Sequence, residues 1–207
     1  MTGWWQSSTG DFWSKIAESP VPNNHTKLSN MQRNNAPHTL AILTTGGTFE
    51  KQYRPDQNGL GFTESGLATW ATQCRLPPNT RLETVMLVDS LDMTDEQRQT
   101  LAQAVAQSPE LHLVIIHGTD TLVQSADLIA LHKRPEQTVV LTGAMIPASQ
   151  PDSDALFNLG LAVAAAQVCP AGCYIAMSGS VLLAKNASKN HQQGRFEGTR
   201  VYLPIQN

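Results

Sequence analysis

Residues 40–49 have the sequence Leu40-Ala-Ile-Leu-Thr-Thr-Gly-Gly-Thr-Phe49, an apolar run of strand length that leads into two adjacent glycines. Glycine tolerates a sharp turn and the close approach of another backbone or a ligand. We therefore expect a buried strand that turns at Gly46-Gly47 and presents Thr48 at its carboxyl end. Two later apolar runs have the same layout: residues 111–116 precede His117-Gly-Thr-Asp-Thr121, and residues 138–141 precede Thr142-Gly-Ala-Met145.

The composition is that of an ordinary globular protein with one substantial domain. The chain has 207 residues, of which 41% are hydrophobic and 15% charged, and its formal net charge is −3. This charge gives no electrostatic reason to expect nucleic acid or an anionic membrane surface as a partner. No run of about 18 apolar residues could span a bilayer, and the N-terminus lacks the layout of a signal peptide. We therefore expect a small-molecule substrate.

The sequence lacks the usual signatures of metal and cofactor sites. Three cysteines, Cys74, Cys169 and Cys173, are too few for a paired zinc site and indicate a reducing, cytoplasmic compartment. No Walker pattern is present, and Gly59-Leu-Gly61 continues as Phe-Thr-Glu, which does not fit the dinucleotide fingerprint. We expect neither a metal nor a cofactor.

Residues 1–37 differ from the rest of the chain and predict an N-terminal extension ahead of a catalytic domain over residues 38–207. The extension is rich in Ser, Asn, Thr and Pro and has no sustained periodicity. It also concentrates large apolar side chains, namely Trp4, Trp5, Phe12, Trp13 and Ile16. Either this segment docks on the domain or on a neighbouring protomer, or it is a flexible leader.

Strands and helices alternate after the first strand. Asn58-Gly59, between Tyr53 and Phe62, predicts a hairpin that overhangs the sheet. Thr94-Asp-Glu-Gln97 is a capping box for a helix, and Asp154 is the expected cap of a later one. The remaining predictions are helices over residues 64–73, 95–107, 123–132 and 155–168, and strands over residues 82–88, 111–116, 138–141 and 173–177.

This alternation predicts an α/β fold with a doubly wound, mostly parallel sheet of the flavodoxin-like kind and a β-hairpin lid after strand one. In such sheets ligands bind outside the carboxyl ends of the strands, where the strand order reverses. Thr48, Ser90, Thr119, Asp120 and Ala144 all follow predicted strands. We expect them to share one pocket, whose hydroxyls and single carboxylate suit acyl transfer.

Several motifs together resemble the bacterial L-asparaginase family, in the short, single-domain form that lacks the C-terminal domain. The match runs in order from about residue 40 to residue 196. Its motifs are Thr45-Gly-Gly-Thr48, His117-Gly-Thr-Asp-Thr121, Gly143-Ala-Met145 with Pro147, Asp154 followed by Phe157-Asn158-Leu159, and residues 178–189. In typical members a second domain of a neighbouring protomer completes the pocket, so the resemblance also implies a homodimer or a higher homo-oligomer.

The resemblance implies hydrolysis of L-asparagine to L-aspartate and ammonia through a threonine acyl-enzyme. Thr48 is then the nucleophile, Tyr53 its proton acceptor and Thr119 the second threonine. Asp120 holds the substrate's amino group and links Thr119 to Lys189. Ser90 holds the α-carboxylate, and the backbone amides of Thr119 and Ala144 form the oxyanion hole. The implied substrate-binding residues are Gly47, Asp89, Ser90, Gly118 and Ala144.

Other interpretations stay open. Thr48 could be only a turn residue, Tyr53 a hydrophobic cover and Lys189 a solvated surface lysine, while Asp120 and Thr121 could cap the helix that follows. His117 is better explained as a packed structural histidine than as a base. At the level of function, the alternatives are a glutaminase or broader amidase, and a catalytically silent amino-acid-binding module.

Overall fold

The computed structural model describes residues 40–202, so the predicted extension over residues 1–37 lies outside the described residues. In this part of the chain no helix is long and apolar enough to cross a membrane. In chain order the elements are β1 (Leu40–Gly46), α2 (Gly47–Glu50), β2 (Gln52–Arg54), β3 (Gly59–Gly61), α3 (Leu67–Gln73), β4 (Arg81–Val88), α4 (Asp95–Gln107), β5 (His112–Ile116), α5 (Leu122–His132), β6 (Thr138–Thr142), α6 (Ala155–Val168), β7 (Gly172–Met177), β8 (Ser180–Leu183), the 3₁₀ turn η1 (Ala184–Asn186), β9 (Ser188–Asn190) and β10 (Arg195–Glu197).

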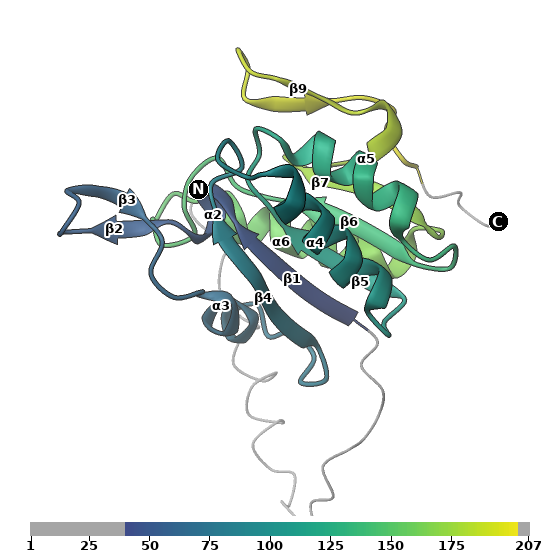
Figure 1. The fold of residues 1–207 in the computed structure, drawn as a ribbon, viewed down its shortest axis with the longest axis horizontal. Coiled ribbons are helices and arrows are strands. Elements are labelled where there is room, and N and C mark those ends of the chain that lie inside the picture. Colours follow the sequence, from purple (N-terminus) through teal and green to yellow (C-terminus); the bar gives the residue numbers. More distant parts are fainter. Residues whose placement is uncertain (1–39, 203–207) are drawn as a thin grey trace, which may run out of the picture. The chain divides into compact units, whose positions relative to one another are not determined.

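The central sheet has the strand order β4-β1-β5-β6-β7-β8 (Figure 1). The first five strands are parallel, and β8 is antiparallel to β7. After β1 the chain adds β4 on one side and then crosses to β5 on the other, so the strand order reverses at the β1–β5 pair. The predicted doubly wound, mostly parallel sheet is confirmed, and its switch point lies where Thr48 and the His117 motif follow their strands.

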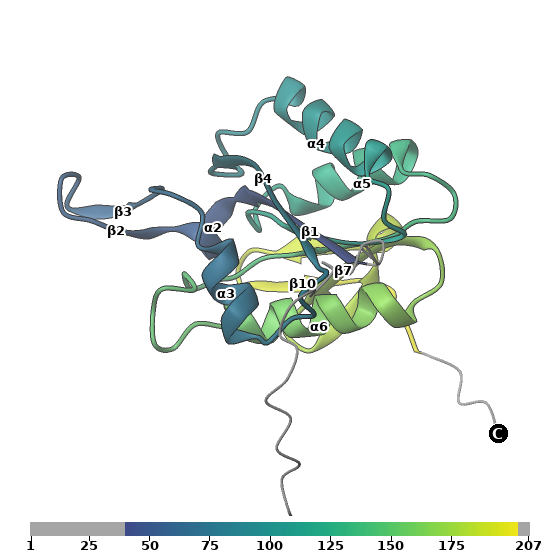
Figure 2. The same cartoon turned by 90° about the horizontal axis from the view of Figure 1, so that it is seen from below.

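Helices cover both faces of the sheet, with α4 and α5 on one face and α3 and α6 on the other (Figure 2). The alternation of side chains along β1 explains the two layers. Ala41 and Leu43 pack in the core with α4 and α5, whereas Leu40 and Ile42 pack in the core with α3 and α6. All seven residues of β1 are buried. The strand that leads to Thr48 is therefore fixed from both sides.

Most predicted elements are found close to their predicted bounds. The capping box at Thr94 is confirmed, since Thr94 Oγ1 accepts from the Gln97 backbone and the Gln97 side chain accepts from the Thr94 backbone. The predicted hairpin is β2–β3, with Asn58 in the left-handed region at φ 46°. The helix expected from residue 64 begins only at Leu67, because Ser65 and Gly66 instead bond to the Glu50 carboxylate.

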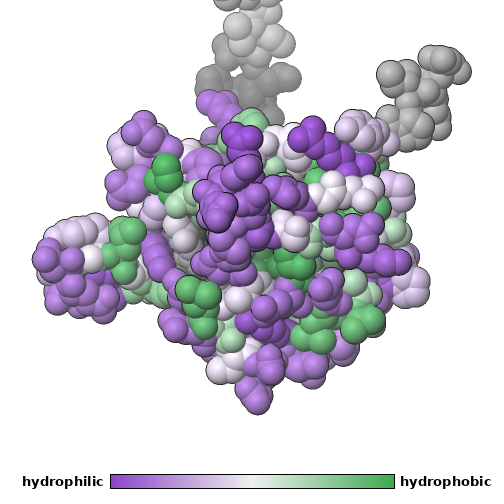
Figure 3. Space-filling view, turned by 90° about the horizontal axis from the view of Figure 1, so that it is seen from above, coloured by the Kyte–Doolittle hydropathy of each residue, from purple (hydrophilic) through white to green (hydrophobic). Residues whose placement is uncertain are grey.

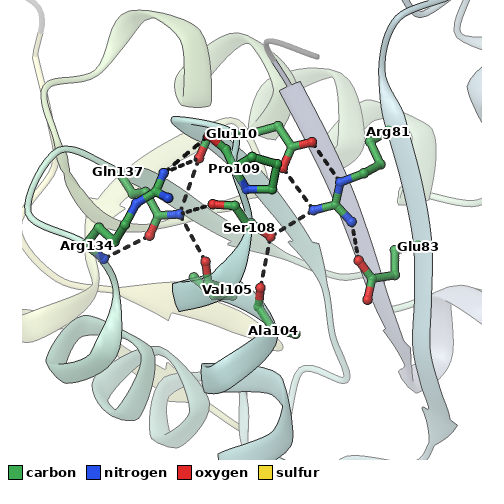
Figure 4. Close-up of polar contacts among 9 residues, drawn as sticks. All are labelled: Arg81, Glu83, Ala104, Val105, Ser108, Pro109, Glu110, Arg134 and Gln137. Carbon is green, nitrogen blue, oxygen red and sulfur yellow. Dashed lines mark hydrogen bonds and ion pairs between the residues drawn. The ribbon is translucent and has the colours of Figure 1, made fainter. Parts of the chain in front are cut away.

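Polar side chains join the start of β4, the end of α4 and the segments before β5 and β6 at the amino end of the sheet, opposite the switch point (Figure 4). The buried amide of Gln137 donates to the carbonyls of Val105, Ser108 and Glu110 at 3.0, 3.2 and 3.2 Å. The Arg81 guanidinium donates to both oxygens of Glu110, at 2.7 and 2.9 Å, and to Ser108 Oγ at 2.8 Å. Because these contacts satisfy buried polar groups, we regard this end as structural.

Candidate active site

Thr48 lies in the first turn of α2, directly after β1. Gly46 and Gly47 join the two elements with φ values of 100° and 66°. A Cβ atom on Gly47 would lie 2.3 Å from the Cα of Gly118, so only glycine lets the end of β1 touch the loop after β5. The other residues of α2 are buried, whereas Thr48 is partly exposed. Within residues 40–202 its hydroxyl makes no hydrogen bond, so it is available to a ligand.

Thr119, Asp120 and Lys189 form a hydrogen-bonded cluster next to this turn. Lys189 Nζ donates to Thr119 Oγ1 at 2.8 Å and to Asp120 Oδ1 at 2.6 Å. The lysine side chain is only 10% exposed, and it reaches the cluster from β9, about 70 residues further along the chain. The alternative that Lys189 is a solvated surface lysine is therefore wrong. Its position gives Thr119 a hydrogen-bond donor whose charge is balanced by Asp120.

Asp89 and Ser90 follow β4 and pack against the same loop. Asp89 Oδ2 accepts from Lys51 Nζ at 2.5 Å, which ties this loop to the end of α2. Burial disfavours the charged carboxylate, but the hydrogen bonds from Lys51 and the Leu91 backbone outweigh it, so the pKa of Asp89 lies below its ordinary value. The hydroxyl of Ser90 is buried and has no hydrogen-bond partner among residues 40–202. A Cβ on Gly118 would lie 2.5 Å from it, so Gly118 is needed for this packing.

The loop around Ala144 follows β6 and is held by α6. Asp154 accepts hydrogen bonds from the backbone N–H groups of Met145 and Ile146, both at 3.0 Å, and Asn158 Nδ2 donates to the Gly143 carbonyl at 3.1 Å. In the described part of the chain the backbone N–H of Ala144 donates no hydrogen bond. This N–H is therefore available to an oxygen atom in the pocket.

The predicted cap at Asp154 and the alternative that Thr121 is a cap are both wrong in their chemistry. Asp154 occupies the cap position of α6, but its carboxylate makes no capping hydrogen bond, because the Met145–Ile146 backbone takes it instead. Thr121 likewise precedes α5 without capping it by its side chain. The Thr121 hydroxyl instead donates to the Ser90 carbonyl at 2.8 Å. Both side chains therefore fix loops of the site rather than helix ends.

Tyr53 lies on the β2–β3 hairpin, which stands away from the body of the molecule (Figures 1 and 3). Its side chain is 58% exposed, and its hydroxyl donates to Asn58 Oδ1 at 3.1 Å on the same hairpin. The structure thus brings Thr119, Asp120 and Lys189 together but does not bring Tyr53 to Thr48. The hairpin projects outward instead of overhanging the sheet, since only its base is tied to the domain.

His117 lies beneath the site in a buried polar network. Its Nδ1 bonds to the Gly118 carbonyl and its Nε2 to Ser125 Oγ, each at 2.8 Å. Burial lowers the pKa of His117 from 6.5 to about 4, so the ring is neutral at physiological pH. Arg98 of α4 donates to both Ser125 Oγ and Thr121 Oγ1. No local sequence pattern indicates a role for Arg98 or Lys51, because each pairs with residues distant along the chain.

No three His, Cys, Asp or Glu side chains come together as a metal-binding group among residues 40–202. The groups that face the switch point there are hydroxyls, the Asp120 carboxylate, the Lys189 ammonium and backbone N–H groups. Such a set supports nucleophilic attack by a hydroxyl and stabilisation of a developing oxyanion.

Comparison with known proteins places the chain in a family. The profile of the family described as "Asparaginase, N-terminal" matches residues 39–197. An L-asparaginase of Thermococcus kodakarensis is 31% identical over 163 residues, which are 75% of this chain and 48% of that protein. Its structure superposes with a TM-score of 0.64 at 28% identity and covers 77% of this chain and 50% of the other.

Two further relatives have different names. A glutaminase-asparaginase of Pseudomonas aeruginosa is 30% identical over 72% of this chain and 45% of that protein. A component of the glutamyl-tRNA(Gln) amidotransferase of Methanococcus vannielii is 28% identical over 77% of this chain and 38% of that protein. The chain spans about half the length, or less, of the curated relatives it matches. The family match extends from β1 to β10, through every loop of the candidate site, and the chain belongs to the asparaginase family.

Proposed function

We propose that this chain is an amidohydrolase that converts L-asparagine to L-aspartate and ammonia through an acyl-enzyme on Thr48. One observation carries the proposal. Thr48, whose partly exposed hydroxyl has no hydrogen bond within residues 40–202, and the Thr119–Asp120 pair follow the two strands that form the switch point, and Lys189 of β9 bonds to that pair. The family match supports the reaction class. Two threonines beside one pocket suit a reaction with two successive nucleophiles, the enzyme hydroxyl and then water.

In the first half-reaction Thr48 Oγ attacks the side-chain amide carbon, and the carbonyl oxygen becomes an oxyanion. The backbone N–H groups of Thr119 and Ala144 point to no acceptor within residues 40–202 and are our candidates for the oxyanion hole. The proton of Thr48 passes to the leaving nitrogen, with Tyr53 as its proposed carrier. The C–N bond breaks, ammonia leaves and an ester remains on Thr48.

In the second half-reaction water attacks this ester. Thr119, bonded to Lys189 and through it to Asp120, is our candidate for relaying the water proton: it accepts this proton while its own hydroxyl proton passes to the departing Oγ of Thr48. The C–O bond breaks, Thr48 regains its proton and L-aspartate leaves. Ser90, whose buried hydroxyl has no partner in the described part of the chain, is the proposed contact for the α-carboxylate of the substrate.

The test is ammonia release from L-asparagine by the wild type and by Thr48→Ala. We expect the substitution to lower turnover by at least about a thousandfold, because it removes the nucleophile itself. Thr100→Ala, on the exposed side of α4, is the matched control and should retain turnover. Thr119→Val should slow hydrolysis of the ester, so mass spectrometry of the substrate-treated protein should detect an aspartyl group on the peptide that holds Thr48. Full activity of Thr48→Ala would rule out this mechanism.

A broader amidase is the second candidate, and the names of two relatives favour it. One methylene separates glutamine from asparagine, and a pocket discriminates such a difference only by about 10- to 200-fold. The ratio of kcat/KM for the two amino acids therefore decides between a selective asparaginase and a broad enzyme. If the protein binds L-aspartate but releases ammonia from neither amide, it is a binding module.

A further inference from the structure

Arg98 is a buried cation on α4, and within residues 40–202 it contacts only uncharged groups at hydrogen-bond distance. Its Nη1 donates to Ser125 Oγ at 2.8 Å, to Thr121 Oγ1 at 3.1 Å and to the sulfur of Met93 at 3.5 Å, and its Nη2 donates to the Met93 carbonyl at 3.4 Å. The residue is 8% exposed. Burying a guanidinium is costly, so a structural role alone would favour a neutral side chain at this position.

These contacts connect Arg98 to two loops of the candidate site. Thr121 Oγ1 accepts from Arg98 and donates to the Ser90 carbonyl at 2.8 Å, so two hydrogen bonds join the cation to the loop after β4. Ser125 Oγ accepts from Arg98 and bonds to His117, which in turn bonds to the Gly118 carbonyl. Arg98 therefore fixes the loop that holds Ser90 relative to the loop that holds Thr119.

The charge of Arg98 is not balanced inside the described part of the protein. Among residues 40–202 the one carboxylate within 4 Å is that of Asp95, at 3.9 Å, and its side chain is fully exposed to water. Burial shifts the pKa of Arg98 downward and Asp95 only partly opposes the shift, yet an arginine still holds its proton at neutral pH. The positive potential of this side chain thus extends toward the Ser90 loop, where the buried Ser90 hydroxyl has no partner among the described residues.

We propose that Arg98 is a positioning and specificity-determining residue, which orders the Ser90 loop and supplies the buried positive charge that selects substrates with an α-carboxylate. This inference rests on the proposed function, because it assigns Ser90 to the carboxylate end of the substrate. Arg98 does not touch the substrate. It acts through Thr121 and through its electric field, which is screened less in the interior than in water.

The experiment compares two substrates that differ in one group. L-asparagine has the α-carboxylate, and 3-aminopropanamide is the same molecule without it. In Arg98→Met we expect KM for asparagine and Kd for L-aspartate to rise about tenfold, the size of a charge interaction across several ångströms of protein. The kcat for asparagine and the kcat/KM for 3-aminopropanamide should change less than about threefold, because the reacting amide is unaffected.

Matched variants separate charge from structure. Arg98→Lys keeps the charge with fewer donors and should restore most of the affinity for asparagine. Arg200→Met removes an exposed arginine and should leave KM and kcat/KM unchanged for both substrates. Thr121→Val keeps Arg98 but breaks the link to the Ser90 carbonyl, and it should raise KM for asparagine alone. This last variant provides the test if Arg98→Met does not fold.

If Arg98→Met loses kcat/KM equally on both substrates, or on neither, the inference is overturned. Asparagine turnover by the wild type would still uphold the proposed function in that case. Conversely, suppose that the wild type binds L-aspartate more tightly than Arg98→Met does but releases no ammonia. That result would uphold the inference and overturn the proposed hydrolysis. A wild type that neither binds L-aspartate nor hydrolyses asparagine would overturn both.

Discussion

Gly47 shows how one residue fixes the geometry of the candidate site. Its φ of 66° lies in the left-handed region, and an added Cβ would clash with the Gly118 backbone at 2.3 Å. Gly47→Ala must therefore push the end of β1 away from the loop after β5, and Thr48 moves with it. We expect the free energy of unfolding to fall by about 2–4 kcal/mol and asparagine turnover by about a hundredfold, because misplacement by about 1 Å is that costly.

Gly194 provides the matched control for this prediction. Its φ of 60° is similar, but nothing lies within 4 Å of the position its Cβ would take. Gly194→Ala thus adds only the left-handed strain, about 1–2 kcal/mol, and should leave kcat unchanged. Urea unfolding and ammonia release measure both variants. Equal effects of the two substitutions would mean that backbone strain, and not the contact with Gly118, explains the requirement for glycine.

His117 makes stability depend on pH. Its pKa is about 4 in the folded protein against 6.5 ordinarily, so between these values the unfolded chain binds a proton that the folded chain does not. The stability from the neutral, buried ring is therefore complete above pH 6.5 and is lost as the pH falls toward 4. The loss is at most about 3 kcal/mol. Urea unfolding of the wild type and of His117→Gln at several pH values should show a steeper acid loss in the wild type; parallel curves would contradict this.

At the scale of elements, α6 positions the loop that holds Ala144. Asp154 lies at the cap position of this helix and Asn158 in its first turn, and together they bond to the backbone of Gly143, Met145 and Ile146. A helix is rigid, so it fixes the direction of the Ala144 N–H more firmly than the loop could alone. If this N–H belongs to the oxyanion hole, its position matters most in the transition state.

We therefore expect Asp154→Ala to lower kcat for asparagine by about 10- to 100-fold and to change KM little. Asp152→Ala, which removes an exposed carboxylate two residues earlier, is the control and should behave as the wild type. Steady-state kinetics of both variants provide the measurement. A rise in KM without a fall in kcat would show that α6 shapes the ground-state pocket and not the oxyanion hole.

At the scale of the whole molecule, the sequence predicts the sheet and the location of the site at the carboxyl ends of its strands better than it predicts side-chain partners. The Gly46-Gly47 turn and the Thr94 capping box are local patterns, so their neighbours in sequence are sufficient to identify them. The Lys51–Asp89 pair and the contacts of Arg98 with Thr121 and Ser125 join residues 23 to 38 positions apart, so they depend on the folded topology. The capping role predicted for Asp154 is wrong because its carboxylate bonds to the backbone of Met145 and Ile146, nine and eight residues earlier in the same β6–α6 loop, and the path of that loop is not a local pattern.

The elements after β7 cannot be predicted from the sequence pattern. β8, β9 and β10 have four, three and three residues, too few for a periodic pattern to be recognised. The turn into β8 is formed by Ser178 and Gly179, at φ values of 49° and 76°, which is typical of a tight hairpin. Only the family resemblance points to Lys189 in the sequence, and its place in the cluster follows from β9.

The β2–β3 hairpin is the element whose position has to change if Tyr53 takes part in the reaction. Its base is anchored by Lys51, which bonds to Asp89, and by Glu50, which accepts from Ser65 Oγ at 2.9 Å and from the Gly66 backbone at 3.0 Å. Tyr53 lies beyond these anchors, and within residues 40–202 its side chain bonds only to Asn58 of the same hairpin. A two-stranded hairpin without further packing is marginally stable, so we expect a ligand that contacts it to shift it over the pocket.

We predict that L-aspartate slows amide hydrogen exchange in residues 52–61 and leaves exchange in α6 unchanged. The buried α6 already packs in the core and serves as the internal reference. Tyr53→Phe keeps the aromatic ring, so it should bind L-aspartate as the wild type does and still lose kcat by about 100-fold, since general acid–base groups contribute on that scale. If bound L-aspartate leaves exchange in residues 52–61 unchanged and Tyr53→Phe turns over normally, the hairpin stays open during the reaction and another group moves the Thr48 proton.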